Sequence, residues 1–235
     1  MSVRFDFRDD VVLVTGASGA LGSAVVTAFR SAGATVCGTD QRPPTSDENH
    51  LDPGAADFYE ADLTTEEEVQ ELMGEVVATH GRLDHVINVA GTWEGGTPLH
   101  ETDVETFQFL FDVNLRTMFL VSKAAIPHLR DTEGTIVSVS ARSSLEGGAG
   151  DGPYRAAKAG VRLLTETIAE EQRGRVRANA VMPSVIDTPT NRELMPDADH
   201  DDWVPPRDIA ETILALCSEA TSVTSGALVP VYGMA

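Results

Sequence analysis

The stretch Val11-Val-Leu-Val-Thr15-Gly16-Ala-Ser-Gly-Ala-Leu-Gly22 decides the fold, because a β-branched run leads into a glycine-rich turn and then into an amphipathic segment over residues 20–31. A strand, a glycine turn and a helix in this order can hold a pyrophosphate, since the helix amides and dipole attract an anion and glycine permits close backbone approach. Glycines also form tight turns without any ligand. The position between a predicted strand and a predicted helix favours a dinucleotide site.

The rest of the chain alternates short apolar runs with longer amphipathic segments, which is typical of a parallel sheet with helices on both faces. The predicted strands are mostly apolar throughout, as strands buried on both faces should be. They cover residues 11–15, 34–39, 57–60, 84–89, 135–140, 177–182 and 227–231. Helices are predicted over residues 20–31, 65–80, 104–130, 154–172 and 206–219. We therefore predict a single α/β domain over residues 1–235 with a seven-stranded parallel sheet.

Two polar, proline-punctuated stretches interrupt this alternation, residues 41–54 and residues 184–206. The first is predicted to be an exposed loop. The second follows a strand, and ligands of open α/β sheets bind beyond the carboxyl ends of the strands. We predict that residues 184–206 form a substrate lid; a plain surface loop is the alternative.

An acidic residue after the second predicted strand indicates which dinucleotide binds. Asp40 lies eighteen positions after Gly22, close to the spacing at which a carboxylate accepts hydrogen bonds from an adenosine ribose. A carboxylate there would repel the extra phosphate of NADP(H), so we predict NAD(H), with NADP(H) disfavoured. Arg42 is a nearby cation that could soften this preference, and a helix or turn cap is the alternative role for Asp40.

Two further strand ends carry candidate cofactor contacts. Asp62 and Leu63 follow the third predicted strand, where an adenine amino group could be read, although capping of the next helix is an equal alternative for Asp62. The stretch Asn88-Val-Ala90-Gly91 follows the fourth. Around the glycine turn, the predicted cofactor-binding residues are Gly16, Ser18, Gly19, Ala20, Leu21 and Gly22.

Charge is the most unusual feature of the composition. There are 37 acidic and 17 basic side chains, a formal net charge of −20, and only two lysines, Lys123 and Lys158. Such a chain is a poor partner for nucleic acid. Its self-repulsion would be relieved by screening, so the composition resembles that of an extreme halophile's protein, with an ordinary acidic protein as the alternative.

The sequence also bears on location. No apolar run approaches the roughly 18 residues of a membrane helix, and the N-terminus lacks the apolar stretch of a secretory signal, so we predict a cytoplasmic protein with no membrane partner. Cys37 and Cys217 have no metal or disulfide spacing and are predicted to be core residues. The six histidines form no recognisable ligand cluster, so no metal site is predicted.

Together these motifs resemble the short-chain dehydrogenase/reductase family over nearly the whole chain. The motifs are the glycine turn at residues 15–22, Asn88-Val-Ala-Gly91, Asn114, Tyr154-Arg-Ala-Ala-Lys158 and Pro183-Ser-Val-Ile-Asp-Thr188. The resemblance implies a Rossmann-type doubly wound domain, hydride transfer to or from nicotinamide, and a homodimer or homotetramer built through the helices at residues 104–130 and 154–172.

Tyr154 and Lys158 are one helical turn apart and so project from the same face. A tyrosine hydroxyl has a pKa near 10, and an adjacent ammonium would lower that pKa so that the hydroxyl can exchange a proton with an alcohol or alkoxide. The resemblance implies that Lys158 also holds the nicotinamide ribose and that Asn114 anchors a water of the proton relay. It further implies that Pro183 and Ile186 line the nicotinamide pocket and that Thr188 contacts the carboxamide or phosphates.

One residue departs from the family pattern. The substrate-orienting serine normally lies thirteen residues before the tyrosine, and that position is Ala141. Either the neighbouring Ser140 takes its place as a catalytic residue, or the reaction needs no such hydroxyl. Quinonoid dihydropteridine reductases resemble this chain in carrying alanine there, and Trp93 and Trp203 could then flank a planar substrate; burial under a loop is the commoner role of tryptophan.

The leading hypothesis is therefore an NAD(H)-dependent oxidoreductase that moves a hydride between nicotinamide and a small carbonyl, alcohol or quinonoid substrate, with Tyr154 transferring the proton. One alternative is a dihydropteridine reductase-like enzyme specifically. Another is a redox sensor that binds NAD(H) without catalysis, which the missing serine keeps open.

The acidic composition gives a prediction about salt. We expect activity and dimer or tetramer integrity to be lost below roughly molar KCl, because unscreened carboxylates then repel one another. Activity assays and light scattering across a KCl series check this. Full activity after days of storage in low-salt buffer would contradict the halophile interpretation.

Overall fold

The structure is a computed structural model that describes residues 5–41, 50–52 and 54–234. Its strands pair only in parallel and follow the order β3-β2-β1-β4-β5-β6-β7. Their bounds are β1 (Val11–Thr15), β2 (Thr35–Asp40), β3 (Asp57–Glu60), β4 (His85–Asn88), β5 (Thr135–Val139), β6 (Arg177–Pro183) and β7 (Leu228–Val231). The predicted seven-stranded parallel sheet is confirmed.

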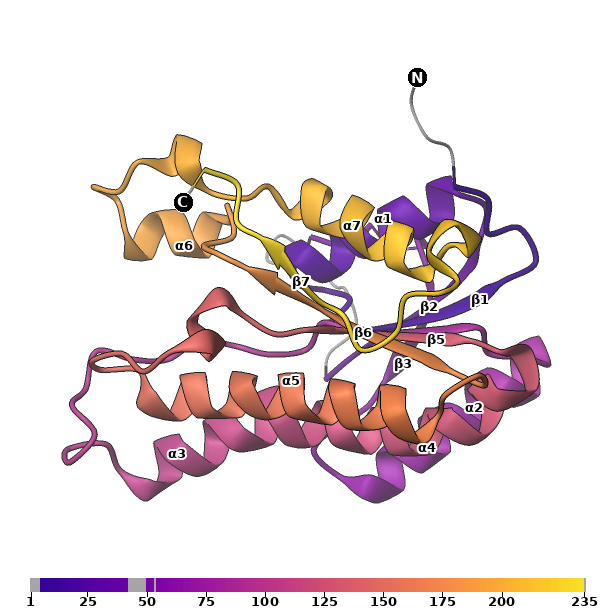
Figure 1. Ribbon diagram of the computed structural model, residues 1–235, viewed down its shortest axis with the longest axis horizontal. Helices are drawn as coiled ribbons and strands as arrows, with labels where there is room; N and C mark the ends of the chain where they lie inside the picture. Colours follow the sequence, from indigo (N-terminus) through magenta and orange to yellow (C-terminus); the bar gives the residue numbers. More distant parts are fainter. Residues whose placement is uncertain (1–4, 42–49, 53, 235) are drawn as a thin grey trace.

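Helices cover both faces of the sheet, as predicted (Figure 1). On one face lie α1 (Ala20–Ser31) and α7 (Pro206–Cys217), and on the other lie α2 (Glu66–His80), α4 (Thr117–Thr132) and α5 (Gly152–Glu171). Each face has its own hydrophobic cluster: Phe29 and Ile213 pack into the first, and Met73 and Leu129 into the second. The buried Cys37 and Cys217 belong to these clusters, which confirms them as core residues.

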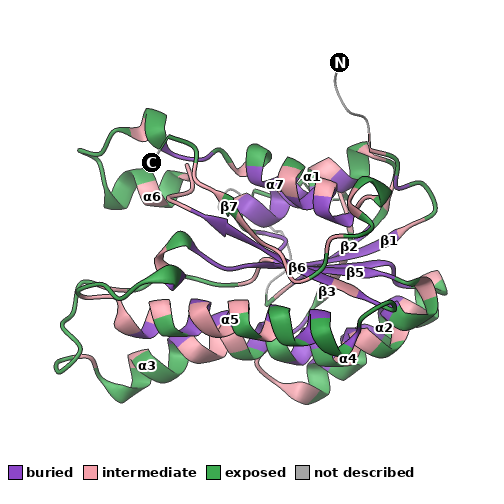
Figure 2. Ribbon diagram, in the orientation of Figure 1, coloured by how far each residue is buried: buried purple, intermediate pink, exposed green. Residues whose placement is uncertain are grey.

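The strands differ in burial according to their place in the sheet (Figure 2). Every residue of β1, β4 and β5 is buried. No residue of β3 or β7 is buried, because these two strands form the edges of the sheet. The expectation that all the strands are buried on both faces is therefore wrong for these two.

The long helix predicted over residues 104–130 is divided. It comprises α3 (Val104–Phe111), a π-helical turn over Asp112–Arg116, and α4. The predicted loop at residues 184–206 contains the short helix α6 (Pro189–Leu194), which lies beyond the carboxyl ends of β6 and β7 (Figure 1). In the predicted loop at residues 41–54, residues 42–49 and 53 lie outside the described residues, and Arg42 is among them.

The strand order creates a crevice at β1, because successive strands are added on one side of β1 up to β3 and on its other side from β4 onward. Strands β2 and β4 flank β1 on its two sides, so the loops that follow β1 and β4 meet at their carboxyl ends. The meeting is close: Gly16 has a φ of +62°, and a Cβ there would lie 2.9 Å from the Cα of Ala90. Gly22, in the first turn of α1, has no room for a Cβ beside the Gly16 carbonyl. Glycine is therefore required at both positions to form the crevice.

Within the part of the chain that the structure describes, no helix combines the length and the apolar character that a membrane crossing requires.

Alanine substitution at two helical glycines should have opposite effects. Gly22→Ala forces a methyl group into the Gly16 backbone and should lower the free energy of unfolding by about 2–3 kcal/mol. Gly74→Ala, in the exposed middle of α2 with open space around it, should raise that free energy by about 0.5–1 kcal/mol. Urea unfolding in molar KCl measures both; equal effects would contradict this packing of α1 on the glycine turn.

Candidate active site

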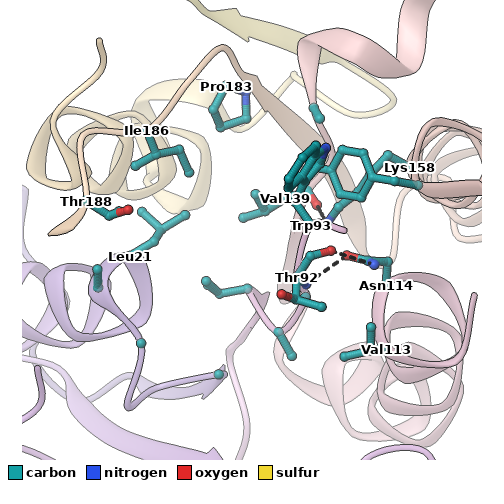
Figure 3. Close-up of a pocket in the computed structure, with 18 of the residues that line it drawn as sticks. Leu21, Thr92, Trp93, Val113, Asn114, Val139, Lys158, Pro183, Ile186 and Thr188 are labelled. Carbon is teal, nitrogen blue, oxygen red and sulfur yellow. Dashed lines mark hydrogen bonds between the residues drawn. The ribbon is translucent and has the colours of Figure 1, made fainter. Parts of the chain in front are cut away.

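One cavity of about 1680 Å³ opens at the carboxyl ends of the strands. It exceeds the roughly 300–1,000 Å³ of ordinary ligand pockets and so has room for a dinucleotide and a substrate together. Figure 3 shows Pro183, Ile186 and Thr188 on one side of it and Asn114 and Lys158 on the other. The predicted site residues that line it are Gly16, Ser18, Gly19, Ala20, Leu21, Gly22, Asp40, Leu63, Ala90, Gly91, Asn114, Ser140, Tyr154, Lys158, Pro183, Ile186 and Thr188.

The glycine turn fits a phosphate group. Helix α1 begins after Gly19, and no side chain in the described part of the chain caps its N-terminal amides. The Ser18 hydroxyl is buried beside the turn and has no hydrogen-bond partner among the described residues. Donors left open at a helix N-terminus, together with an unpartnered hydroxyl, suit the pyrophosphate of a dinucleotide.

Asp40 lies at the edge of this cavity with its carboxylate held by the backbone. One oxygen accepts from the Ser18 amide at 3.3 Å, and the other accepts from the Gln41 amide at 2.9 Å. The carboxylate thus caps a turn, and its remaining lone pairs are available to a ribose. The two roles considered for Asp40 are compatible.

Two predicted cofactor contacts do not line the cavity. Asp62 accepts hydrogen bonds from the amide and hydroxyl of Thr64 at 2.9 and 2.7 Å, and these bonds lower the pKa of its carboxyl group. Asn88 is buried in the sheet, where its amide donates to the hydroxyls of Ser122 and Ser138, both at 3.2 Å. In this structure Asp62 stabilises a turn and Asn88 ties β4 to β5 and α4.

Asn114 lies in the π-helical turn and holds the loop after β4. Its amide oxygen accepts from the Thr92 amide at 3.1 Å, and its nitrogen donates to the carbonyls of Thr92 and Leu110 (Figure 3). Leu110 lies four residues before Asn114, in α3. Gly91 completes the arrangement, because a Cβ there would lie 2.7 Å from the Asn114 oxygen and 3.0 Å from the Lys158 nitrogen.

Tyr154 and Lys158 share one face of α5, as predicted, and both line the cavity. The Lys158 ammonium donates to the Val139 carbonyl at 3.0 Å and lies 6.0 Å from the centroid of the Tyr154 ring. Burial lowers the pKa of Lys158 to about 8. Burial, reinforced by the charge of Asp151, raises the pKa of Tyr154 to about 12.

The pKa of Tyr154 therefore differs from the sequence expectation. An ammonium was expected to lower it, but desolvation of the phenolate outweighs that effect where the ammonium is turned toward β5. The hydroxyl is held in its protonated form, which is the form that donates a proton to a carbonyl oxygen.

Ser140 is placed differently from a substrate-orienting serine. Its hydroxyl donates to the Lys158 carbonyl at 2.8 Å and lies 3.2 Å from the Ser144 hydroxyl, and the residue is buried. In this structure that hydroxyl binds the backbone of α5. Ala141 itself lines the cavity with its methyl group.

The segment after β6 forms the opposite wall. Thr188 caps α6 by accepting from the Asn191 amide at 3.2 Å, and Ile186 forms a bridge with Val204. Trp203 is buried against the His200 ring and does not line the cavity, whereas Trp93 is half exposed and does. Of the two roles considered for the tryptophans, Trp203 fits burial and Trp93 lies where it could flank a substrate.

Sequence reasoning missed an ion pair at the mouth of the cavity. Arg155 donates through Nε to the Asp151 carboxylate at 2.6 Å, and both residues line the cavity beside Tyr154. The signal was available, because an Asp and an Arg four residues apart at the start of a helix face each other.

Comparisons with known proteins agree on the family. Residues 10–199 match the family model described as short chain dehydrogenase. L-fucose dehydrogenase of Oryctolagus cuniculus is 37% identical over 191 residues, which are 80% of this chain and 66% of that protein, just under two thirds of its length. Cis-4-hydroxycyclohexanecarboxylate dehydrogenase of Sinomonas cyclohexanicum is 33% identical over 97% of this chain and 96% of its own.

Among solved structures, the ligand-free aldohexose dehydrogenase of Thermoplasma acidophilum superposes with a TM-score of 0.87. It is 26% identical in sequence, and the match covers 97% of this chain and 94% of the other. None of these relatives is named as a dihydropteridine reductase, so they do not support that finer resemblance.

The buried ammonium should make stability depend on pH. The pKa of Lys158 is about 8 in the folded chain and ordinarily 10.5, so between these values the unfolded chain holds the extra proton. The free energy of unfolding of the wild type, relative to that of Lys158→Met, should therefore rise from about pH 8 to about pH 10. Below pH 8 the full cost of burying the charged ammonium should be present. Urea unfolding checks this, with Lys123→Met, which removes the exposed lysine that pairs with Glu66, as the matched control. Parallel stability curves for wild type and Lys158→Met would contradict it.

Proposed function

This chain belongs to the short-chain dehydrogenase family and is an oxidoreductase, and on that premise we propose that it interconverts an alcohol and a carbonyl compound with NAD(H). The observation that carries the proposal is the placement of Tyr154 and Lys158 in a cavity large enough for a dinucleotide and a substrate. The glycine turn and Asp40 line the same cavity and supply the cofactor contacts.

The names of the relatives support this substrate class. L-fucose and cis-4-hydroxycyclohexanecarboxylate, the compounds in the names of two similar dehydrogenases, both carry hydroxyl groups on saturated carbon. A dihydropteridine substrate is the second candidate, favoured by the alanine at position 141. An NAD(H)-binding sensor is less favoured, since the proton-transfer pair is intact.

The chain's own residues account for the proton. A bound nicotinamide supplies or accepts the hydride. In reduction, the Tyr154 hydroxyl donates its proton to the substrate oxygen, and in oxidation the phenolate takes it back. The Lys158 ammonium, 6.0 Å from the centroid of the Tyr154 ring, would turn from the Val139 carbonyl to stabilise that phenolate, and its three N–H donors also suit the nicotinamide ribose.

Two other predicted catalytic residues help to position the Tyr154–Lys158 pair. Asn114 fixes the loop at Thr92, which places that loop against Lys158. Ser140 fixes α5 through the Lys158 carbonyl and so orients the ammonium. We assign both as positioning residues. Without a hydroxyl at Ala141, the Tyr154 hydroxyl alone polarises the substrate oxygen.

We also propose that residues 184–206 close over the substrate. Ile186 and Thr188 line the cavity, and α6 lies beyond the carboxyl ends of β6 and β7. A second copy of the chain would cover the exposed apolar side chains on the helices of one face. These are Val104, Phe107, Phe109, Phe119 and Leu163. A homodimer or homotetramer in the cytoplasm, acting on a small molecule, remains our proposal.

Tyr154→Phe tests the proton donor. The variant keeps the ring and its packing but loses the hydroxyl, so turnover should fall by at least about 10²-fold while NADH binding changes little. Steady-state NADH absorbance and fluorescence titration with NADH measure the two effects. Activity within a few-fold of wild type would overturn the assignment of Tyr154.

Asp40→Asn tests the cofactor preference, because it removes the charge while leaving the size of the side chain. The ratio of kcat/KM for NADPH to that for NADH should rise at least about 10-fold, since a like charge no longer faces the extra phosphate. Asp131→Asn, on the exposed surface of α4 and away from the cavity, is the matched control. An unchanged ratio in Asp40→Asn would show that another group sets the preference.

A further inference from the structure

The charges around the cavity are not all balanced. Among the described residues, three lysine or arginine side chains line it: Arg142, Arg155 and Lys158. Arg155 is paired with Asp151 at 2.6 Å, and Lys158 is buried against the Val139 carbonyl. Arg142 has no carboxylate within ion-pair distance among the described residues. An unmatched cation in a chain with a net charge of −20 needs an explanation.

The guanidinium of Arg142 stacks on an aromatic ring and donates no hydrogen bond to the residues that the structure describes. Its central carbon lies 4.9 Å from the centroid of the Tyr232 ring, and stacking of this kind uses the flat face of the group. Tyr232 is itself anchored, because its carbonyl accepts from the Ser184 hydroxyl at 2.8 Å. The N–H groups along the edge of Arg142 therefore remain available to an anion.

Arg142 lines the same cavity as the reacting residue Tyr154. It directly follows Ala141, and both residues line the cavity that contains Tyr154. Arg142 is exposed, so its long side chain is open to a ligand in that cavity. A group a few carbon atoms from the reacting carbon can therefore reach it.

We infer that the substrate is a monoanion, a hydroxy- or oxo-carboxylate whose carboxylate pairs with Arg142 while its reacting carbon lies at Tyr154. The inference rests on the proposed function and names its substrate class. A planar carboxylate matches the fork of one arginine. A phosphate dianion is a poorer fit, because Glu146 also lines the cavity and would repel the second charge.

The net negative charge of the protein makes a local cation necessary for binding an anionic substrate. At low salt the many surface carboxylates repel an anionic substrate. At 1 M salt the Debye length is about 3 Å, so the distant repulsion is screened while a contact pair retains part of its strength. Arg142 then determines whether a carboxylate is bound.

Matched substrates test the inference. The kcat/KM of the wild type in molar KCl should be higher for 4-hydroxycyclohexanecarboxylate and 3-hydroxybutyrate than for the corresponding amides, which lack the charge. Arg142→Gln should lower kcat/KM for the acids by about 10- to 100-fold and leave the amides little changed. Arg142→Lys should restore part of the loss. Glu146→Gln should raise kcat/KM for the acids, because it removes a repelling charge from the cavity. Arg207→Gln, at an exposed position outside the cavity, should leave kcat/KM unchanged for both the acids and the amides.

Binding gives a second readout that does not need turnover. With NADH present, the acids should raise the melting temperature of the wild type more than that of Arg142→Gln. No preference for acids, an equal loss for acids and amides in Arg142→Gln, or equal thermal shifts would overturn the inference. Failure of the proposed function is distinct: the wild type would then oxidise neither acids nor amides, or Tyr154→Phe would remain active.

Discussion

The close approach of two loops at the centre of the sheet is the constraint on which the rest of the structure depends. Gly16 accommodates Ala90 of the neighbouring loop, and Gly22 lets the first turn of α1 pack against the Gly16 carbonyl. This contact opens the N-terminus of α1 toward the cavity and sets where the loop after β4 begins. Asn114 then fixes that loop through Thr92, so the position of the proton-transfer region follows from the glycine turn.

Much of the fold could be predicted from the sequence, because buried parallel strands are apolar throughout and α1 has a clear glycine-rich start. Helix α1 was predicted with the bounds that the structure gives it. Sequence periodicity did not show that β3 and β7 are edges, since the order of strands depends on pairing between distant segments. It also gave no sign of the π-helical turn at Asn114, whose side chain donates to the carbonyls of Leu110 and Thr92.

The residues of the candidate site were predicted less evenly. Spacing along a single helix is reliable, and it placed Tyr154 and Lys158 on one face. Spacing does not determine the direction of a side chain at the end of a strand: Asn88 points into the sheet, and Ser140 binds the backbone of α5. The pKa of Tyr154 was also missed, because desolvation depends on the packing of the whole cavity, which no local pattern describes.

The two tryptophans differ sharply in environment, and this has an optical consequence. Trp203 is buried beneath the segment after α6, while half of the Trp93 surface is exposed and its ring faces the cavity. The indole emission of the protein therefore has one component set by the interior and another set by whatever occupies the cavity. Replacing Trp203 by phenylalanine would leave a chain with a single intrinsic fluorophore that reports binding directly, without a coupled assay or an attached dye.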